Sequence, residues 1–289
     1  MTKIIVDSTC DLPEELLEKY SITTLPLRIL IKDVEYLDKR TIRIEEVYTA
    51  MRAGILPRTS QPRPKDIYNL FMEYCNKGID FIYLAFSSAL SGTFQVAESI
   101  AAEFKSKFPK IKIAVIDSKG GSTAAGLIAL QAAKLAEAYN DFDIIVNEVS
   151  ELIKHVEHIF TISDLNWLIK GGRISKTKGL FGSLLDIKPI LDVKDGEMEV
   201  IQKIRGRRKA INAVVDILEK RLEKFPNQII GISHADDIET ANELMEIIKK
   251  RIGNNNFIVN KIGSVLGSHL GIGGVGVFFF NDKNKLYID

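Results

Sequence analysis

Residues 80–95, with the sequence DFIYLAFSSALSGTFQ, decide the fold of this chain. The first part of this stretch, residues 81–86, consists of six apolar or aromatic residues in a row, without the alternation of a half-exposed strand. An uninterrupted apolar run of this kind is typical of a strand covered on both faces, and helical patterns stand on both sides of it. We therefore predict a central parallel strand in an α/β sheet.

Small hydroxyl residues follow this strand, where the chain turns into the next helix. Ser91, Gly92 and Thr93 lie at the start of a helix expected over about residues 93–107. The first backbone N–H groups of a helix have no partner within it and bind anions readily, so these residues are a candidate anion-binding site. Ser91 is equally suited to capping the helix without a ligand, and the stretch alone leaves both interpretations open.

The length and the charge of the chain limit its class. Its 289 residues suit two ordinary α/β domains better than one small core. The 39 lysines and arginines nearly balance the 38 acidic residues, which gives a net charge of +1. Charge therefore gives no sign of a nucleic-acid partner, and we expect none.

No segment of the chain has the pattern of a targeting or membrane segment. The apolar run near the N-terminus ends at Val6 and is too short for a signal peptide, and no stretch approaches the roughly 20 apolar residues that span a bilayer. We expect a cytoplasmic protein without a membrane span. Cys10 and Cys75 lack metal-ligand spacing, and we interpret both as small packing residues.

Two further junctions between a strand and a loop carry hydroxyl and acidic residues. Asp7, Ser8 and Thr9 follow a short strand, and residues 117–122 follow another. We favour a structural role for the first group, because an Asp at such a place more often ties the loop than binds a ligand. The alternation of strands and helices indicates a parallel sheet, whose ligands lie outside the carboxyl ends of the strands. The hydroxyl loops lie at that edge.

A proline-rich segment supplies two more hydroxyl groups. Residues 57–64, PRTSQPRP, contain three prolines and predict a stiff loop without regular structure. In such a loop, Thr59 and Ser60 lose little entropy when they bind a ligand. The same segment also suits the cap of a helix expected over residues 66–77, so its role stays open.

A second domain is expected to begin near residue 158, which divides the chain into residues 1–157 and 158–289. Its first helix ends at a pair of glycines, with Lys170 and Arg173 beside them. Arg205 begins a basic cluster that precedes another helix. The cluster suits a phosphate or an acidic partner, although solvated basic residues are common at the start of a helix.

The last loop of the chain is rich in glycine. Residues 263–274 contain five glycines around His269, which lets the backbone approach a ligand or another loop closely. No Gly-Lys-Ser/Thr follows, and the spacing does not match the dinucleotide fingerprint, so a nucleotide-binding module is not expected. We treat the other histidines, His155, His158 and His234, as structural.

Taken together, these pieces resemble the motifs of the DegV family of bacterial fatty-acid-binding proteins. They run in the family's order over essentially the whole chain, and their number makes the resemblance specific. The matching pieces are DSTCDLP (7–13), TSQP (59–62), LSGTF (90–94), KGGRIS (170–175), RGR (205–207), HAD (234–236) and the glycine loop around His269.

The resemblance implies the two-domain DegV-like (EDD) fold. In this fold an N-terminal parallel sheet flanked by helices is followed by a C-terminal α/β domain, and the ligand lies between the two. The expected ligand is a long-chain fatty acid, bound without covalent attachment and without cofactor or metal. Hydroxyls matching Thr59 and Ser91 hold its carboxylate with His269 nearby, and Ser60, Gly92 and Thr93 belong to the same site.

The resemblance also implies a partner. Proteins of this family look like the carrier subunit of a fatty acid kinase, which presents the carboxylate to a separate ATP-using subunit. The resulting acyl phosphate feeds phospholipid synthesis, and the carrier itself is not an enzyme. Lys170, Arg173 and Arg205 would then lie at the opening of the site, where they meet phosphate or dock the kinase subunit.

Simple energetics agree with a carrier. A C16 tail removes about 15 methylenes from water at about 0.8 kcal/mol each, so the tail can supply the affinity while the head group is held loosely. The competing interpretation is a serine hydrolase or acyl transferase with Ser91 as nucleophile and His269 as base. The chain lacks the Gly-x-Ser-x-Gly motif, and no acid to orient His269 is evident in the sequence.

Overall fold

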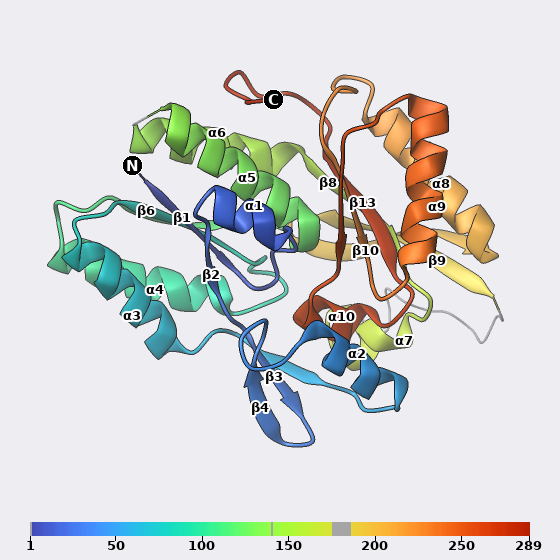
Figure 1. Cartoon of the computed structure of the whole chain (residues 1–289), viewed down its shortest axis with the longest axis horizontal. Helices are drawn as coiled ribbons and strands as arrows, with labels where there is room; N and C mark the ends of the chain where they lie inside the picture. The colour runs from blue at the N-terminus through green and yellow to red at the C-terminus, as the bar shows by residue number, and fades with distance from the viewer. Residues whose placement is uncertain (1, 140, 175–185) are drawn as a thin grey trace.

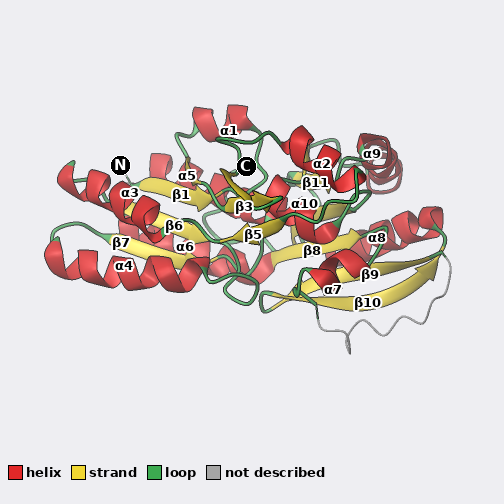
Figure 2. Ribbon diagram, turned by 90° about the horizontal axis from the view of Figure 1, so that it is seen from below, coloured by secondary structure: helices red, strands yellow, loops and turns green. Residues whose placement is uncertain are grey.

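The computed structural model describes residues 2–139, 141–174 and 186–289. The described strands form three sheets, and helices pack around them (Figure 1). Seen from below, the parallel sheet and a mixed sheet lie side by side along the long axis of the molecule, with β3 and β5 between them (Figure 2). Among the described residues, no helix combines the length and the apolar character needed to cross a membrane.

The first sheet is parallel throughout. Its order is β2-β1-β6-β7, and the strands are β1 (Lys3–Asp7), β2 (Thr23–Leu25), β6 (Phe81–Ala85) and β7 (Ile113–Asp117). Every residue of β6 is buried, which confirms the central parallel strand predicted from its apolar run. Pro26 ends β2, so the strand expected over residues 24–31 is in fact two strands, and β2 lies at the edge of this sheet.

Helices cover both faces of the parallel sheet. One face packs against α3 (Pro64–Asn76) and α4 (Thr93–Lys107), and the other against α5 (Ser122–Ala138) and α6 (Phe142–His155). The short helix α1 (Glu14–Lys19) packs against the second group. Both cysteines are unpaired and buried in these cores, as expected for small packing residues.

The second sheet has the order β10-β9-β8-β13-β11-β12. Its strands are β8 (Val156–Thr161), β9 (Ile187–Lys194), β10 (Glu197–Arg205), β11 (Ile230–His234), β12 (Phe257–Lys261) and β13 (Val275–Phe280). Among the described strands of this sheet, only β11 and β12 pair in parallel. Helices α8 (Arg207–Arg221) and α9 (Ile238–Ile252) cover one face of this sheet. The two-part α/β architecture agrees with the expected fold class.

A small antiparallel sheet corrects the prediction for the proline-rich segment. It has the order β4-β3-β5, with β3 (Arg28–Ile31), β4 (Val34–Leu37) and β5 (Arg58–Ser60). The expectation of no regular structure over residues 57–64 is therefore wrong for β5. The prolines, at positions 57, 62 and 64, lie outside residues 58–60, which therefore keep their N–H groups for pairing.

The glycine-rich loop also contains more structure than expected. Residues Ser264–Leu270 form the short helix α10, which packs with α2 (Ile44–Arg52) and α7 (Asn166–Lys170). Gly267 permits this packing, because a Cβ atom there would lie 2.4 Å from the Tyr48 hydroxyl oxygen. Burial of Val265 in a hydrophobic core outweighs the poor helix propensity of glycine.

The two sheets share contacts through α5. This helix packs against β1 of the first sheet and against β8, β11 and β13 of the second. The buried Asp11 carboxylate adds a polar contact, since it accepts hydrogen bonds from Ser122 Oγ at 2.7 Å and from the Gly263 backbone N–H at 2.9 Å. The domain boundary between residues 157 and 158 stays a prediction, and the nearest strand, β8, begins at Val156.

Candidate functional site

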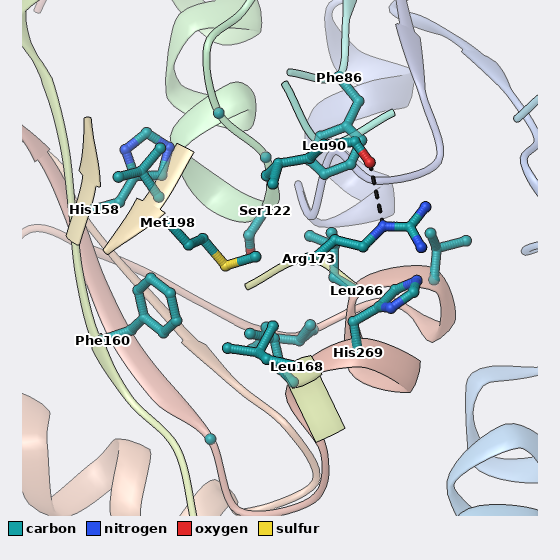
Figure 3. A pocket seen from close by; sticks show the side chains of 18 of the residues that line it. Phe86, Leu90, Ser122, His158, Phe160, Leu168, Arg173, Met198, Leu266 and His269 are labelled. Atoms are coloured by element: carbon teal, nitrogen blue, oxygen red, sulfur yellow. Dashed lines mark hydrogen bonds between the residues drawn. The ribbon is translucent and has the colours of Figure 1, made fainter. Parts of the chain in front are cut away.

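A largely apolar cavity lies between the parallel sheet and the mixed sheet. It contains about 890 Å³ of space free of atoms, part of it open to solvent. Its lining comes from the loops that follow β6 and β7, from β5, and from elements after residue 157. Figure 3 labels ten of these side chains: Phe86, Leu90, Ser122, His158, Phe160, Leu168, Arg173, Met198, Leu266 and His269.

The walls of the cavity are built from apolar side chains of several elements. Phe86 and Leu90 come from the loop after β6, Phe160 from β8, Leu168 from α7 and Met198 from β10. Strand β8 turns Phe160 toward the cavity and Ile159 toward the core under α8 and α9, as the alternation of a strand requires. Such walls suit a ligand with a long apolar part.

Polar side chains gather in one part of this cavity. Thr59 Oγ1 shares a hydrogen bond of 2.7 Å with Nε2 of His269, and Ser60, Ser91 and Arg173 also line the space. Four of the six residues proposed from the sequence as fatty-acid contacts are therefore cavity residues. The fold brings them together from β5, α10 and the loop between β6 and α4.

Arg28 fixes the position of β5. Its Nε donates a hydrogen bond to the Gln61 carbonyl oxygen at 2.9 Å, and its Nη2 donates one to Ser60 Oγ at 2.6 Å. The backbone of Thr59 pairs with that of Ile29 on β3. The Ser60 hydroxyl accepts this hydrogen bond and keeps its own O–H for another partner, whereas the Thr59 hydroxyl is the one of the two that contacts His269.

Asp7 holds the loop that follows β6. Its buried carboxylate accepts hydrogen bonds from the backbone N–H groups of Phe86, at 2.7 Å, and of Thr9, at 3.0 Å. Burial raises the pKa of Asp7, and the hydrogen bonds from Thr9 and Phe86 partly offset that rise. These contacts agree with the structural role favoured from the sequence.

Both interpretations of Ser91 find support in its contacts. Ser91 Oγ shares a hydrogen bond of 2.9 Å with Thr93 Oγ1 and accepts one of 3.3 Å from the Thr93 backbone N–H, so it braces the start of α4. Ser91 also lines the cavity, whereas Gly92 and Thr93 do not. Gly92 lets the proline-rich segment pack closely, since a Cβ atom there would lie 2.5 Å from Gln61 Oε1.

The imidazole of His269 is held in its neutral form. Burial and, to a smaller extent, the nearby positive charge of Arg173 together lower the pKa of His269 to about 4. The ring packs against Gly171, where a Cβ atom would lie 2.3 Å from Nδ1, and Nδ1 has no hydrogen-bond partner among the described residues. The side chain is therefore a hydrogen-bonding group and not a fixed cation.

The three basic residues proposed as partner contacts take different positions. Arg173 lines the cavity, and its guanidinium donates hydrogen bonds to the carbonyl oxygens of Leu90, at 3.2 Å, and Gly171, at 2.7 Å. Lys170, at the end of α7, and Arg205, at the end of β10, are exposed and lie outside the cavity lining. Ser175, the last residue of the KGGRIS motif, lies outside the described residues.

Four polar residues of the cavity were not predicted as site residues: Gln61, Ser122, His158 and Thr161. Gln61 directly follows Thr59 and Ser60 in the proline-rich segment, and this position next to two candidate site residues could have indicated that it belongs to the site. His158 was treated as structural, and it is buried, but it also lines the cavity. Its position directly before the apolar residues Ile159 and Phe160 of a strand could have indicated a buried polar group in the site.

Comparison with known proteins identifies similar chains over almost the full length. Residues 1–282 match the model of the family described as "Uncharacterised protein, DegV family". A DegV domain-containing protein of Clostridium perfringens is 37% identical over 285 residues, which cover 98% of each chain. A second one, from Clostridium acetobutylicum, is 38% identical over 281 residues, covering 96% of this chain and 97% of that protein.

Solved structures of similar shape have been described as fatty-acid-binding proteins. A DegV family protein from Thermus thermophilus, described by its fatty acid binding, superposes with a TM-score of 0.88 at 28% identity, covering 96% of this chain and 99% of that one. DegV from Bacillus subtilis, a fatty acid binding protein, gives a TM-score of 0.86 at 30% identity with the same coverage. A stearic acid-binding protein from Eubacterium ventriosum superposes with a TM-score of 0.89 at 26% identity, covering 96% of this chain and 97% of that one.

Proposed function

Because the chain belongs to the DegV family, we propose that it binds a long-chain fatty acid without covalent attachment. The tail occupies the apolar cavity, and the carboxylate is held by hydrogen bonds from Thr59, Ser91 and His269. The single observation that carries this proposal is the cavity itself, which joins long apolar walls to a cluster of hydroxyl and imidazole groups. The fatty acid binding described for similar solved structures supports it.

The polar cluster suits a carboxylate that must stay reactive. A carboxylate that leaves water needs hydrogen-bond donors, and hydroxyl groups together with a neutral imidazole offset that cost without a fixed salt bridge. The Arg173 guanidinium, although near, donates to two backbone carbonyls. The affinity then comes mainly from the tail, while the head group remains free to react.

The hydrolase or acyl transferase alternative finds less support in the geometry. His269 Nε2 is hydrogen-bonded to Thr59 and not to Ser91, whose hydroxyl pairs with Thr93. Within the described residues, Nδ1 of His269 has no carboxylate or carbonyl to orient it. The base and the orienting acid of a serine nucleophile are both required for that chemistry.

The test of this function is the identity of the ligand that copurifies with the protein. Mass spectrometry of an organic extract should detect an intact long-chain fatty acid, and mass spectrometry of the protein should show no covalent adduct. Steady turnover of an ester substrate that is lost in Ser91→Ala would overturn the carrier and favour the hydrolase. An extract without fatty acid, from protein that also fails to bind added stearate, would refute the proposal itself.

The head-group contacts can be tested with a substitution that keeps side-chain shape. Thr59→Val removes one hydroxyl, and we expect stearate affinity to fall by about 3- to 10-fold, because one hydrogen bond contributes roughly 0.5–1.5 kcal/mol. Titration calorimetry measures the change. Thr49→Val, at an exposed position of α2, is the matched control and should bind as the unaltered protein does. Equal affinities of all three proteins would place the carboxylate elsewhere.

We further propose that the protein presents this carboxylate to a separate ATP-using kinase subunit. The acyl phosphate formed there would enter phospholipid synthesis, and the cytoplasm, where ATP is available, is the location that this role requires. The exposed Lys170 and Arg205 are proposed to contact the kinase or its phosphate groups, with Arg173 at the cavity.

Reversing one exposed charge tests this docking role. Arg205→Glu should leave stearate affinity unchanged but lower the rate of phosphoryl transfer with the kinase subunit by about 10-fold, since charges at an interface rim act mainly on association. Transfer of radioactive phosphate to bound fatty acid measures the rate. Lys250→Glu, in the last turn of α9, serves as a control of the same charge change. Equal loss in both variants would indicate a general charge effect without a docking surface.

A further inference from the structure

His158 lies in the wall of the cavity, well away from the proposed head-group contacts. It is on β8, where it and Phe160 face the cavity while Ile159 between them faces the opposite core. In Figure 3 the His158 and His269 rings lie on opposite sides of the cavity, with Met198 and Leu168 between them. A fatty acid whose carboxylate lies at His269 would therefore bring a more distant part of its tail to His158.

The imidazole of His158 has no hydrogen-bond partner among the described residues. Both ring nitrogens are buried and unpaired, and the residue is only 3% exposed. The ring packs edge-on against Phe278, with centroids 5.9 Å apart, and against Gly120, where a Cβ atom would lie 2.1 Å from Nε2. Buried polar groups in proteins are almost always hydrogen-bonded, so a histidine left in this state calls for a partner beyond the described residues, and a bound ligand in the cavity can supply it.

The chemistry of the ring limits what this partner can be. Burial lowers the pKa of His158 to about 4, so the ring is neutral near pH 7 and offers one N–H donor and one acceptor nitrogen. A carboxylate is a poor match, because it needs several hydrogen-bond donors, and the side chains Phe160, Phe278 and Met198 in this part of the cavity are apolar. A hydroxyl group fits, because it can accept from the N–H or donate to the other nitrogen.

From this arrangement we propose that His158 forms a second polar subsite, which selects fatty acids that carry a hydroxyl group along the tail. The inference rests on the proposed function, because it assumes that the carboxylate lies beside Thr59 and His269. An unsubstituted tail leaves the ring nitrogens unpaired, whereas a hydroxyl at the right carbon satisfies one of them. The cavity then binds the hydroxylated chain more tightly than the plain chain of the same length.

The test compares matched ligands on protein freed of copurified lipid. Affinities are measured by calorimetry for stearic acid and for a set of hydroxystearic acids with the hydroxyl in the middle or near the end of the chain. We expect one of these positions to bind about 3- to 10-fold more tightly than stearic acid, which is the contribution of one hydrogen bond. His158→Phe should remove this preference, so that stearic acid and the hydroxystearic acid bind with equal affinity.

Two further variants keep the result interpretable. His158→Gln retains hydrogen-bonding groups and should keep a preference for a hydroxylated chain, even if His158→Phe fails to fold. Phe160→Leu is the matched control on the same face of β8, and it should weaken both kinds of ligand alike. Loss of the preference only in His158→Phe would support the subsite.

The outcomes separate this inference from the proposed function. If neither stearic acid nor any hydroxystearic acid binds, the fatty-acid proposal itself fails. If stearic acid binds but no hydroxylated chain is preferred, or if the preference persists in His158→Phe, only the subsite is refuted. A crystal structure with a hydroxystearic acid that shows water alone on His158 would refute it in the same way.

Discussion

Met198→Trp is expected to lower the affinity for stearate by about 100-fold or more. Met198 extends from β10 into the middle of the cavity, between His158 and Arg173 (Figure 3), and it is buried. An indole at this position occupies space that the tail requires, so that about four methylenes can no longer be buried. At about 0.8 kcal/mol for each methylene, the loss is roughly 3 kcal/mol, or about 100-fold in the dissociation constant.

The control for this variant is Met198→Leu, which keeps an apolar side chain of similar size. Its affinity for stearate should stay within about 3-fold of the unaltered protein, because similar-volume apolar exchanges cost little. Titration calorimetry with stearate gives both values, and circular dichroism verifies the fold. A shorter acid, such as octanoate, should be affected much less by the tryptophan, since its tail ends before the filled region. Unchanged stearate affinity in Met198→Trp would mean that the tail does not occupy this cavity.

The sequence predicted the parallel sheet well, because the evidence for it is local. The apolar run that forms β6 has no alternation, and a strand of this kind has few alternatives once helical patterns flank it. The small sheet was not predicted, since β5 depends on pairing with Ile29 and Arg28, about thirty residues earlier in the chain. Helix α10 was missed for a similar reason, because its packing depends on the close approach of Gly267 to Tyr48, which is distant in the sequence.

The candidate site was only partly accessible from the sequence. The motifs identified Thr59, Ser91 and His269 as candidates, but the hydrogen bond between Thr59 and His269 joins residues 210 positions apart. The engagement of Ser60 by Arg28 likewise depends on the position of β5 in its sheet. His158 shows the limit most clearly. Whether a histidine in a strand is paired within the core or faces a cavity depends on residues distant in the sequence that pack against it, here Gly120 and, on the neighbouring strand β13, Phe278.

The stability of the protein should depend on pH through His158. The folded state keeps this ring neutral, since burial lowers its pKa from 6.5 to about 4, whereas in the unfolded chain the ring titrates near 6.5. Between these values the unfolded state binds the proton and the folded state does not. The contribution of His158 to stability is therefore fully present above about pH 6.5 and is lost as the pH falls toward 4.

The size of this effect follows from the difference between the two pKa values. A shift of this size corresponds to about 3 kcal/mol, lost from the free energy of unfolding between pH 7 and pH 4. Other buried groups titrate over part of the same range. Burial raises the pKa of Asp11 to about 6, so its contribution to stability changes in the opposite direction, and His269 acts in the same direction as His158. The pH dependence of the free energy of unfolding is therefore the sum of contributions from several groups.

A comparison of variants separates the contribution of His158 to this pH dependence from those of the other groups. Urea denaturation of His158→Phe and of the unaltered protein, at pH 7 and at pH 4, gives two differences in the free energy of unfolding. The difference in the free energy of unfolding, variant minus unaltered protein, should be about 3 kcal/mol more favourable to the variant at pH 4 than at pH 7. The reason is that the variant has no imidazole to protonate in the unfolded state. Phe160→Leu, a neighbour without a titrating group, should show the same difference at both pH values. If the His158→Phe difference is equally constant, the ring is not held neutral in the cavity wall, and its role as an unpaired hydrogen-bonding group fails as well.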